Sequence, residues 1–234
     1  MLWDTALPAN LGYIASILYN QNNCINEAGS VTSKYEIEVG KDLCEMLGFD
    51  RDKCRGHLTS GGTIANIEAL WAARNVKLLP LACKSALEKE SSLQKARDEF
   101  EIFLPQRSKR VLYLDATTWE LLNLDVDAVL DIVTDVLDIV NKDLEEENAL
   151  TYIELMNLFK KYTVESLGFY EFYKRYQMKS PPCVLAPTTA HISLLKAMNI
   201  AGLGTSDTSL VLVPVDENAR MNIKCTFWSR LIYF

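Results

Sequence analysis

The chain has 234 residues and a formal net charge of −7, with 49% hydrophobic and 24% charged residues. These values are ordinary for a globular enzyme domain, and the negative charge with interspersed basic residues argues against nucleic acid as a partner. No basic region followed by an apolar core opens the chain and no 18 apolar residues run together, so we expect neither export nor membrane insertion. The six cysteines form no CxxC pair, which predicts reduced cytoplasmic thiols rather than a zinc site or disulfides.

The first 50 residues are predicted to form a helical N-terminal segment. Apolar periodicity predicts a helix over 10–19, and the polar run 20–26 predicts a loop whose asparagines favour turns. A second helix is predicted over 33–46, with Gly48 as its stop and one apolar side formed by Tyr35, Val39 and Leu43. We interpret this segment as scaffold.

Residues 57–75, HLTSGGTIANIEALWAARN, join a Thr/Ser/Gly-rich turn to an alanine-rich helix. Hydroxyls and open backbone N–H groups over 59–63, at the positive end of a helix dipole, are groups that bind a phosphate. Glycine suits such a turn because a Cβ would hold the anion away from the amides. From these residues alone, an ordinary capped helix explains the pattern as well as a phosphate site does. Further along, an apolar stripe is predicted to pack in a core: Ile64, Ile67, Leu70 and Trp71.

The middle of the chain is predicted to be helical. Residues 78–110 form a Lys/Glu-rich segment with a solvated face, and 152–176 form another surface helix. Residues 125–144 are strongly amphipathic, with an apolar side formed by Val129, Leu130, Val133, Val136, Leu137 and Val140. The opposite side of this helix is acidic, and carboxylates are possible metal ligands. Exposure to solvent explains these carboxylates equally well and no further metal-binding residues accompany them, so no metal site is predicted.

Two short strands are predicted near the end of the chain. Pro181-Pro182 ends the helices, 183–186 and 210–215 are buried strands, and a helix through Met198 lies between them. Strand, helix and strand make a βαβ unit with parallel pairing, so the expected fold class is α/β. Ligands of such sheets lie beyond the carboxyl ends of the strands, and His191 follows one such end.

Four separated blocks carry a resemblance to a known family. They are LYNQNNCINEAGSVTSKYEIEVGKDLCEMLGF (18–49), TSGGTIANIEALWAARN (59–75), APTTAHISLLKAMNIAGLG (186–204) and VPVDENARMNI (213–223). In this order they resemble the group II pyridoxal-phosphate-dependent amino-acid decarboxylases, most of all the bacterial-type tyrosine decarboxylases. The insert WELLNLDVDAVLDIVTDVLDI (119–139) resembles the same longer enzymes.

The resemblance implies a fold and a domain organisation. The chain would hold an incomplete fold-type-I, aspartate-aminotransferase-like domain: a helical segment over 1–50, a partial cofactor-binding large domain over 51–223 and a divergent tail over 224–234. A helical insertion would occupy about 80–180 of the large domain.

The resemblance also implies a cofactor, pyridoxal 5'-phosphate, and residues that bind it. Gly62 and Thr63 would hold its phosphate, Ser60 and Gly61 would shape the loop, and Asn66 would be a weaker polar neighbour. The implied reaction is the release of carbon dioxide from an amino acid such as tyrosine through an aldimine of the cofactor.

His191 lies in TTAHISLLKA, which resembles the family motif whose histidine stacks on the pyridine ring and helps to position the substrate. It is the predicted catalytic residue, although Ile192 stands where the family commonly has an aromatic residue. The other histidine, His57, is predicted to be structural. Asn22 and Asn23 fit a substrate mouth or an ordinary turn equally well.

The family's Schiff-base lysine and the aspartate that protonates the pyridine ring lie downstream of the VPVD block. After 223 this chain departs into KCTFWSRLIYF, and neither Lys196 nor Lys224 matches the Schiff-base position. We therefore expect a truncated family member that is inactive by itself. The full-length family implies a homodimer in the cytoplasm. Two alternatives stay open: a non-catalytic fragment that pairs with a full-length decarboxylase, and another fold-type-I enzyme such as an aminotransferase or a sphingosine-phosphate-lyase relative.

Overall fold

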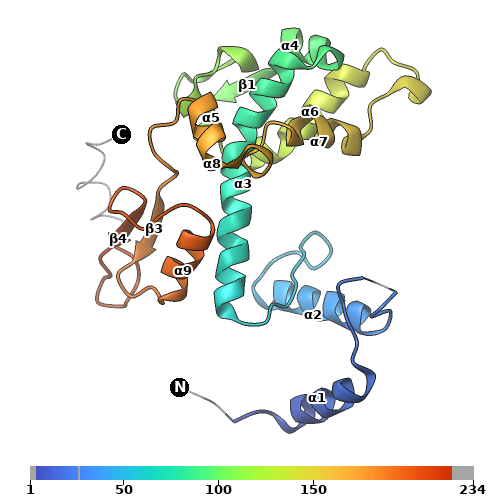
Figure 1. Ribbon diagram of the computed structural model, residues 1–234, viewed down its shortest axis with the longest axis vertical. Coiled ribbons are helices and arrows are strands. Elements are labelled where there is room, and N and C mark those ends of the chain that lie inside the picture. The colour runs from blue at the N-terminus through green and yellow to red at the C-terminus, as the bar shows by residue number, and fades with distance from the viewer. Residues whose placement is uncertain (1–3, 26, 223–234) are drawn as a thin grey trace. The chain divides into compact units, whose positions relative to one another are not determined.

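The computed structural model of this protein describes residues 4–25 and 27–222 (Figure 1). The predicted divergent tail and the last residue of the VPVD block lie outside them. The chain divides into two compact units, one up to Ser60 and one from Gly61 onward. The second contains both helices and small sheets, so the α/β prediction is confirmed at that level. Within the described ranges, no helix has the length and apolar character needed to cross a bilayer.

Where the structure describes it, the first unit contains two helices, α1 (Leu7–Tyr19) and α2 (Thr32–Met46). Helix α1 begins three residues before the predicted start because a proline occupies its first turn, where the missing N–H costs no helical hydrogen bond. Asn20 ends it in the left-handed conformation, at φ 45°. Gly48 ends α2 as predicted, at φ +84°, and its N–H donates to the carbonyl oxygen of Glu45 at 2.9 Å.

The predicted apolar side of α2 is exposed, so its periodicity did not identify the buried face. Its buried residues are Gly40 and Cys44, one turn apart. A Cβ on Gly40 would lie 2.3 Å from the carbonyl oxygen of Gly56, so glycine is needed where this later segment passes over the helix. Backbone proximity therefore selects the buried face of α2.

The second unit is built on one long helix, α3 (Gly62–Lys89), which crosses the centre of Figure 1. The remaining elements follow in chain order: η1 (Ser91–Leu93), α4 (Gln94–Glu99), β1 (Glu101–Leu104), β2 (Lys109–Leu112), η2 (Tyr113–Asp115), α5 (Thr118–Leu122), α6 (Val126–Asn141), η3 (Glu146–Asn148), α7 (Tyr152–Lys160), α8 (Val164–Arg175), β3 (Val184–Pro187), α9 (Ser193–Ile200) and β4 (Leu210–Val213).

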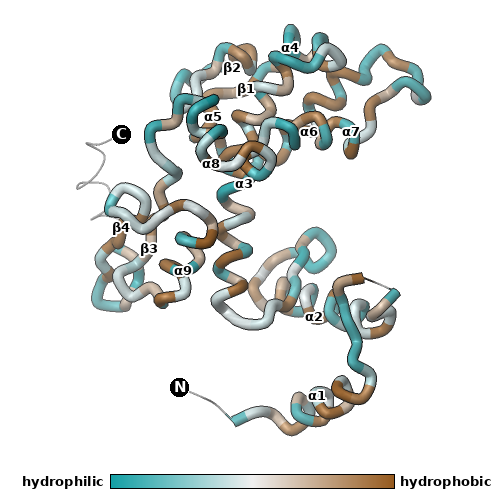
Figure 2. The backbone as a smooth tube through the Cα atoms, viewed as in Figure 1, coloured by the Kyte–Doolittle hydropathy of each residue, from teal (hydrophilic) through white to brown (hydrophobic). Residues whose placement is uncertain are grey.

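The larger core lies around the second half of α3, against α4, α6 and α7. The alternation of apolar and polar residues along α6 can be followed in Figure 2. The predicted apolar side of α6 is confirmed at Val129, Val133, Val136 and Val140, which are buried, whereas Leu130 is 57% exposed. Helix α6 therefore contributes one apolar face to this core, as expected of an amphipathic helix.

Two expectations for the middle of the chain are wrong. The segment 78–110, predicted to be helical, ends in an antiparallel hairpin in which Glu101 pairs with Leu112 and Leu104 with Lys109. Exposed and buried residues alternate along β1, and this period of two is typical of a strand. The single surface helix over 152–176 is two helices, α7 and α8, which place buried side chains in the core: Leu155, Phe159, Val164 and Phe172.

The predicted βαβ unit is present. Strands β3 and β4 pair in parallel, from Val184 opposite Leu210 to Pro187 opposite Val213, and α9 connects them. A second small core forms around Met198 and Leu203, and Leu70 of α3 packs against it. Two other residues of the predicted stripe on α3 are not core, since Ile64 is 40% and Trp71 49% exposed, and Ile67 is half-buried. The first half of α3 therefore buries a narrower face than its sequence suggests.

Candidate functional site

The N-terminus of α3 presents backbone donors next to open space. The N–H groups of Ile64 and Ala65 donate to the carbonyl oxygen of Gly61 at 3.0 and 3.1 Å. Those of Gly62 and Thr63 belong to the first turn, where a helix offers no carbonyl partner. A Cβ built on Gly61 or Gly62 would meet no atom within 4 Å. This helix end therefore has the donors and the room that an anion such as a phosphate requires.

A hydrogen-bonded chain of three side chains joins α3 to the start of α9. The Asn66 side chain donates through Nδ2 to the hydroxyl oxygen of Ser193 at 2.7 Å. That hydroxyl lies 2.9 Å from Nδ1 of His191, and the Ser193 backbone N–H donates to the same nitrogen at 3.2 Å. Ser193 is only 3% exposed, so its hydroxyl is held in place by these partners. We call these residues the Asn66–Ser193–His191 chain.

The direction of these hydrogen bonds fixes the tautomer of His191. A backbone N–H can only donate, so Nδ1 must accept with its lone pair and the proton of the neutral ring must be on Nε2. Asn66 donates to the serine oxygen, which leaves the serine hydroxyl hydrogen to donate to Nδ1 as well. The neutral imidazole is thus anchored through one nitrogen and keeps the other as a donor.

The helix geometry brings the predicted residues of the second unit together. Gly62 and Asn66 are one turn apart on the same face of α3, about 6 Å along the axis. His191 is tied to Asn66 through one serine side chain, so the imidazole lies next to the helix end that carries the predicted phosphate loop. Ser60 ends the first unit, is exposed, and is described only with that unit.

Sequence reasoning missed Ser193. Its signal was present in the motif TTAHIS, because a hydroxyl two residues after a histidine can return to the imidazole at the start of a helix. Nothing in the sequence showed that its partner would be Asn66, which is 127 residues away.

A second contact holds α9 against α3. The guanidinium of Arg74 donates through Nη1 to the carbonyl oxygen of Ala201, at the end of α9, at 2.9 Å. The same guanidinium lies over the ring of Phe169 at 5.3 Å from its centroid. Phe169 in turn covers Gly202, whose φ is +72° and where a Cβ would lie 2.3 Å from the ring. The position of the Asn66–Ser193–His191 chain is therefore supported from the other end of α9.

The predicted polar residues of the first unit make local hydrogen bonds. The side-chain oxygen of Asn22 accepts the backbone N–H of Cys24 at 2.9 Å, which is an asparagine-stabilised turn. Asn23 donates to a carboxylate oxygen of Glu36 at 2.8 Å. Of the two interpretations left open for these asparagines, the turn has direct support at Asn22, whereas Asn23 joins its loop to α2. His57 is exposed and also belongs to this unit.

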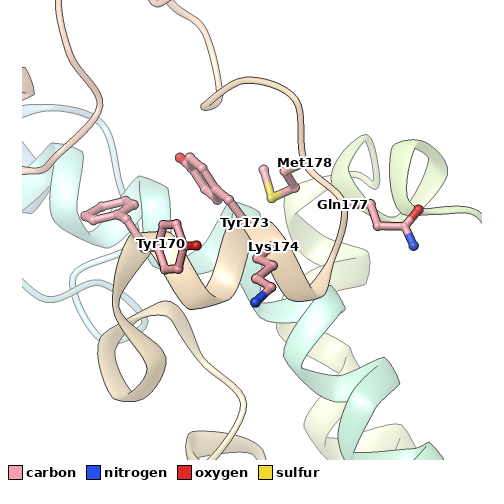
Figure 3. A pocket seen from close by; sticks show the side chains of 6 residues that line it. Tyr170, Tyr173, Lys174, Gln177 and Met178 are labelled. Carbon is pink, nitrogen blue, oxygen red and sulfur yellow. The ribbon is translucent and has the colours of Figure 1, made fainter.

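A hollow of about 510 Å³ occurs on α8, away from the predicted residues. It is open and lined by Phe169, Tyr170, Tyr173, Lys174, Gln177 and Met178 (Figure 3). None of the predicted site residues lines it, so it adds nothing to the candidate cofactor site.

Comparison with known proteins identifies similar sequences. This chain is 30% identical over 220 residues to an L-tyrosine decarboxylase of Enterococcus faecium, covering 94% of this chain and 28% of that protein. It is also 30% identical over 221 residues to an L-tyrosine decarboxylase of Levilactobacillus brevis, covering 94% of this chain and 27% of that protein. The chain therefore spans a little over a quarter of the length of these relatives. No protein-family model matches it.

Proposed function

Because this chain is a relative of the L-tyrosine decarboxylases, within the group II pyridoxal-phosphate-dependent amino-acid decarboxylases, we propose that it forms part of a pyridoxal phosphate site. The reaction we assign to the whole site is that of a carboxy-lyase, which releases carbon dioxide from an amino acid, with L-tyrosine as the first substrate to test. The fold we propose for the second unit is fold type I. A homodimer in the cytoplasm completes the proposal.

The N-terminus of α3 would hold the cofactor phosphate. The amides of Gly62 and Thr63 are oriented by the helix and meet the anion with the positive end of its dipole. Gly61 and Gly62 leave the space that the phosphate needs to approach those amides. When bound, pyridoxal phosphate supplies an electron-withdrawing ring that accepts the electrons left behind as carbon dioxide departs.

His191 would orient the ring of the cofactor and the substrate beside it. Its flat imidazole is held through Nδ1 by Ser193, and Ser193 is held by Asn66, so the ring has a defined orientation before any ligand arrives. Pre-organised groups lower the entropy cost of positioning a reactant. The proton on Nε2 makes His191 a hydrogen-bond donor toward a substrate oxygen. The single observation that carries the proposal is this anchored imidazole next to the glycine-rich helix end.

One observation favours a second candidate function, a non-catalytic subunit that pairs with a longer decarboxylase. Large apolar side chains of α1 are exposed, including Leu11, Ile14 and Leu18 at 59%, 60% and 80%. Exposed apolar patches mark association surfaces. Co-expression with a full-length relative and co-purification of the two chains would support this candidate.

The cofactor proposal is tested by equilibrium dialysis against pyridoxal phosphate and against pyridoxal, which lacks the phosphate. We expect the phosphate to improve affinity by about tenfold or more, since charge-assisted hydrogen bonds to an anion are strong. The Gly62→Ala variant should fold normally, because its added methyl group meets no atom, and should lose most of that advantage.

Gly12→Ala is the matched control, because a Cβ at Gly12 also meets no atom and the residue lies in α1. It should leave the affinity unchanged. Equal binding of the two vitamers, or full affinity in the Gly62→Ala variant, would refute the proposed phosphate site.

A further inference from the structure

A second pocket, with a volume of about 380 Å³, lies between α3, α5 and the segment that leads into β3. Lys77 of α3 lines it together with Trp119 and Leu122 of α5 and with Met178, Pro181 and Pro182. Lys77 lies 11 residues after Asn66, about 16 Å further along α3. The pocket is therefore separate from the candidate cofactor site. Its volume is within the range of small-molecule sites in proteins.

Lys77 is the charged residue in the lining of this pocket, whose other polar residues are Asn123, Ser180 and Cys183. Its side chain is half-buried, and among residues 4–25 and 27–222 its ammonium group has neither an ion pair nor a hydrogen bond. Lys84, two turns later, shows the contrast, because its ammonium donates to the carbonyl oxygens of Leu114 and Ala116 at 2.7 and 2.6 Å. Burial lowers the pKa of Lys77, as expected for a cation that has lost water and gained no counter-charge.

Much of the remaining lining is apolar or aromatic. Trp119 is 54% exposed although it borders the pocket, and two consecutive prolines and Met178 line the pocket as well. An aromatic ring gains contact area and stacking against such a wall, and the thioether of methionine adds a favourable contact with ring edges. The pocket thus combines one cation with a surface suited to a ring.

We propose that the Lys77 pocket binds a small aromatic monocarboxylate. The carboxylate accepts hydrogen bonds from Nζ of Lys77, and the ring lies against Trp119 and the proline pair. A single ammonium balances a single negative charge, whereas a phosphate dianion would bring two charges against one and would lose more hydration. This inference does not rest on the proposed function, because the two sites share no residue.

The test is a titration of the full chain with 4-fluorobenzoate, followed by ¹⁹F NMR. We expect saturable binding with a Kd on the order of 1 mM, since a small ligand gains little beyond one ion pair and one ring contact. The uncharged analogue 4-fluorobenzyl alcohol should bind at least about tenfold more weakly. Lys77→Gln should weaken fluorobenzoate binding by about tenfold, and Lys77→Arg should stay within about threefold of the parent because it keeps the charge.

Lys109→Gln is the matched control, because it removes the same charge from an exposed lysine of β2 that lies outside the pocket. It should leave the affinity unchanged, and circular dichroism of each variant checks folding. The proposal is overturned if fluorobenzoate shows no saturable binding, if Lys77→Gln binds it as tightly as the parent does, or if the alcohol binds as well as the acid. The last outcome would identify a purely apolar pocket.

Discussion

Replacing Ser193 with alanine tests the Asn66–Ser193–His191 chain. The variant removes one hydroxyl that is 3% exposed, accepts from Asn66 at 2.7 Å and lies 2.9 Å from Nδ1 of His191. A hydrogen bond makes a net contribution of about 1 kcal/mol to stability, and a buried donor left without a partner lowers stability by about 1–3 kcal/mol. The backbone N–H of Ser193 still donates to Nδ1, so the loss is partial. We expect the free energy of unfolding to fall by about 1–3 kcal/mol.

Two measurements check this prediction. Urea denaturation gives the change in the free energy of unfolding. Nitrogen NMR of the imidazole rings gives the tautomer, and the chain has only two histidines to assign, His57 and His191. The parent should show His191 with its proton on Nε2, and Ser193→Ala should move that ring toward a mixture of tautomers while His57 is unchanged.

A matched control is available in Ser209→Ala. Ser209 is 4% exposed, and its hydroxyl lies 3.1 Å from that of Ser206. This variant should leave both imidazole signals as in the parent. If Ser193→Ala has unchanged stability and His191 keeps its parent tautomer, the hydroxyl does not anchor the imidazole and the reasoning is refuted.

Two further predictions concern the second unit. Gly202→Ala should destabilise it by about 2 kcal/mol or more, because the residue has φ +72° and its Cβ would lie 2.3 Å from the Phe169 ring; an unchanged urea midpoint would contradict this. The ion pair with Arg107, at 2.5 Å, and hydrogen bonds from Thr117 lower the pKa of Glu120 from 4.5 to about 2. Its contribution to stability is therefore present above about pH 4.5 and is lost as the pH falls toward 2. As the pH falls from 4.5 to 2, the urea midpoint of the parent should fall more steeply than that of Glu120→Gln. Parallel plots of midpoint against pH for the two proteins would contradict the prediction.

The elements with one clear periodicity could be predicted from the sequence. Helix α6 repeats valine at helical spacing beside an acidic face. Elements β3, α9 and β4 carry the apolar runs of a βαβ unit, and Gly202 and Gly204 lie in the connection between α9 and β4. Helix α2 shows the limit, since its apolar residues are regular but backbone proximity at Gly40 decides which face is buried.

The hairpin and the long helix could not be predicted well. Strand β1 has only four residues and begins with Glu101, so charge composition suggested a continued helix. Pro80 lies inside α3, where its missing N–H would normally end a helix, and packing of both neighbouring turns into the larger core overrides that preference.

For the candidate site, the sequence predicted the residue types but not their connection. Gly62 and His191 were selected by the phosphate-loop pattern and by family resemblance. The serine that joins His191 to Asn66 depends on how α9 packs against α3, and such long-range packing is not encoded in any local period.

We propose that the start of α3 and the His191 imidazole belong to one site. The most direct measurement is an NMR titration with pyridoxal phosphate that follows the backbone amides of Gly62 and Thr63 together with the ring nitrogens of His191. We expect all of these signals to shift along one saturation curve, and we expect inorganic phosphate to shift the amides alone. Movement of the amides without the imidazole at saturating pyridoxal phosphate, or no movement of either, would contradict it.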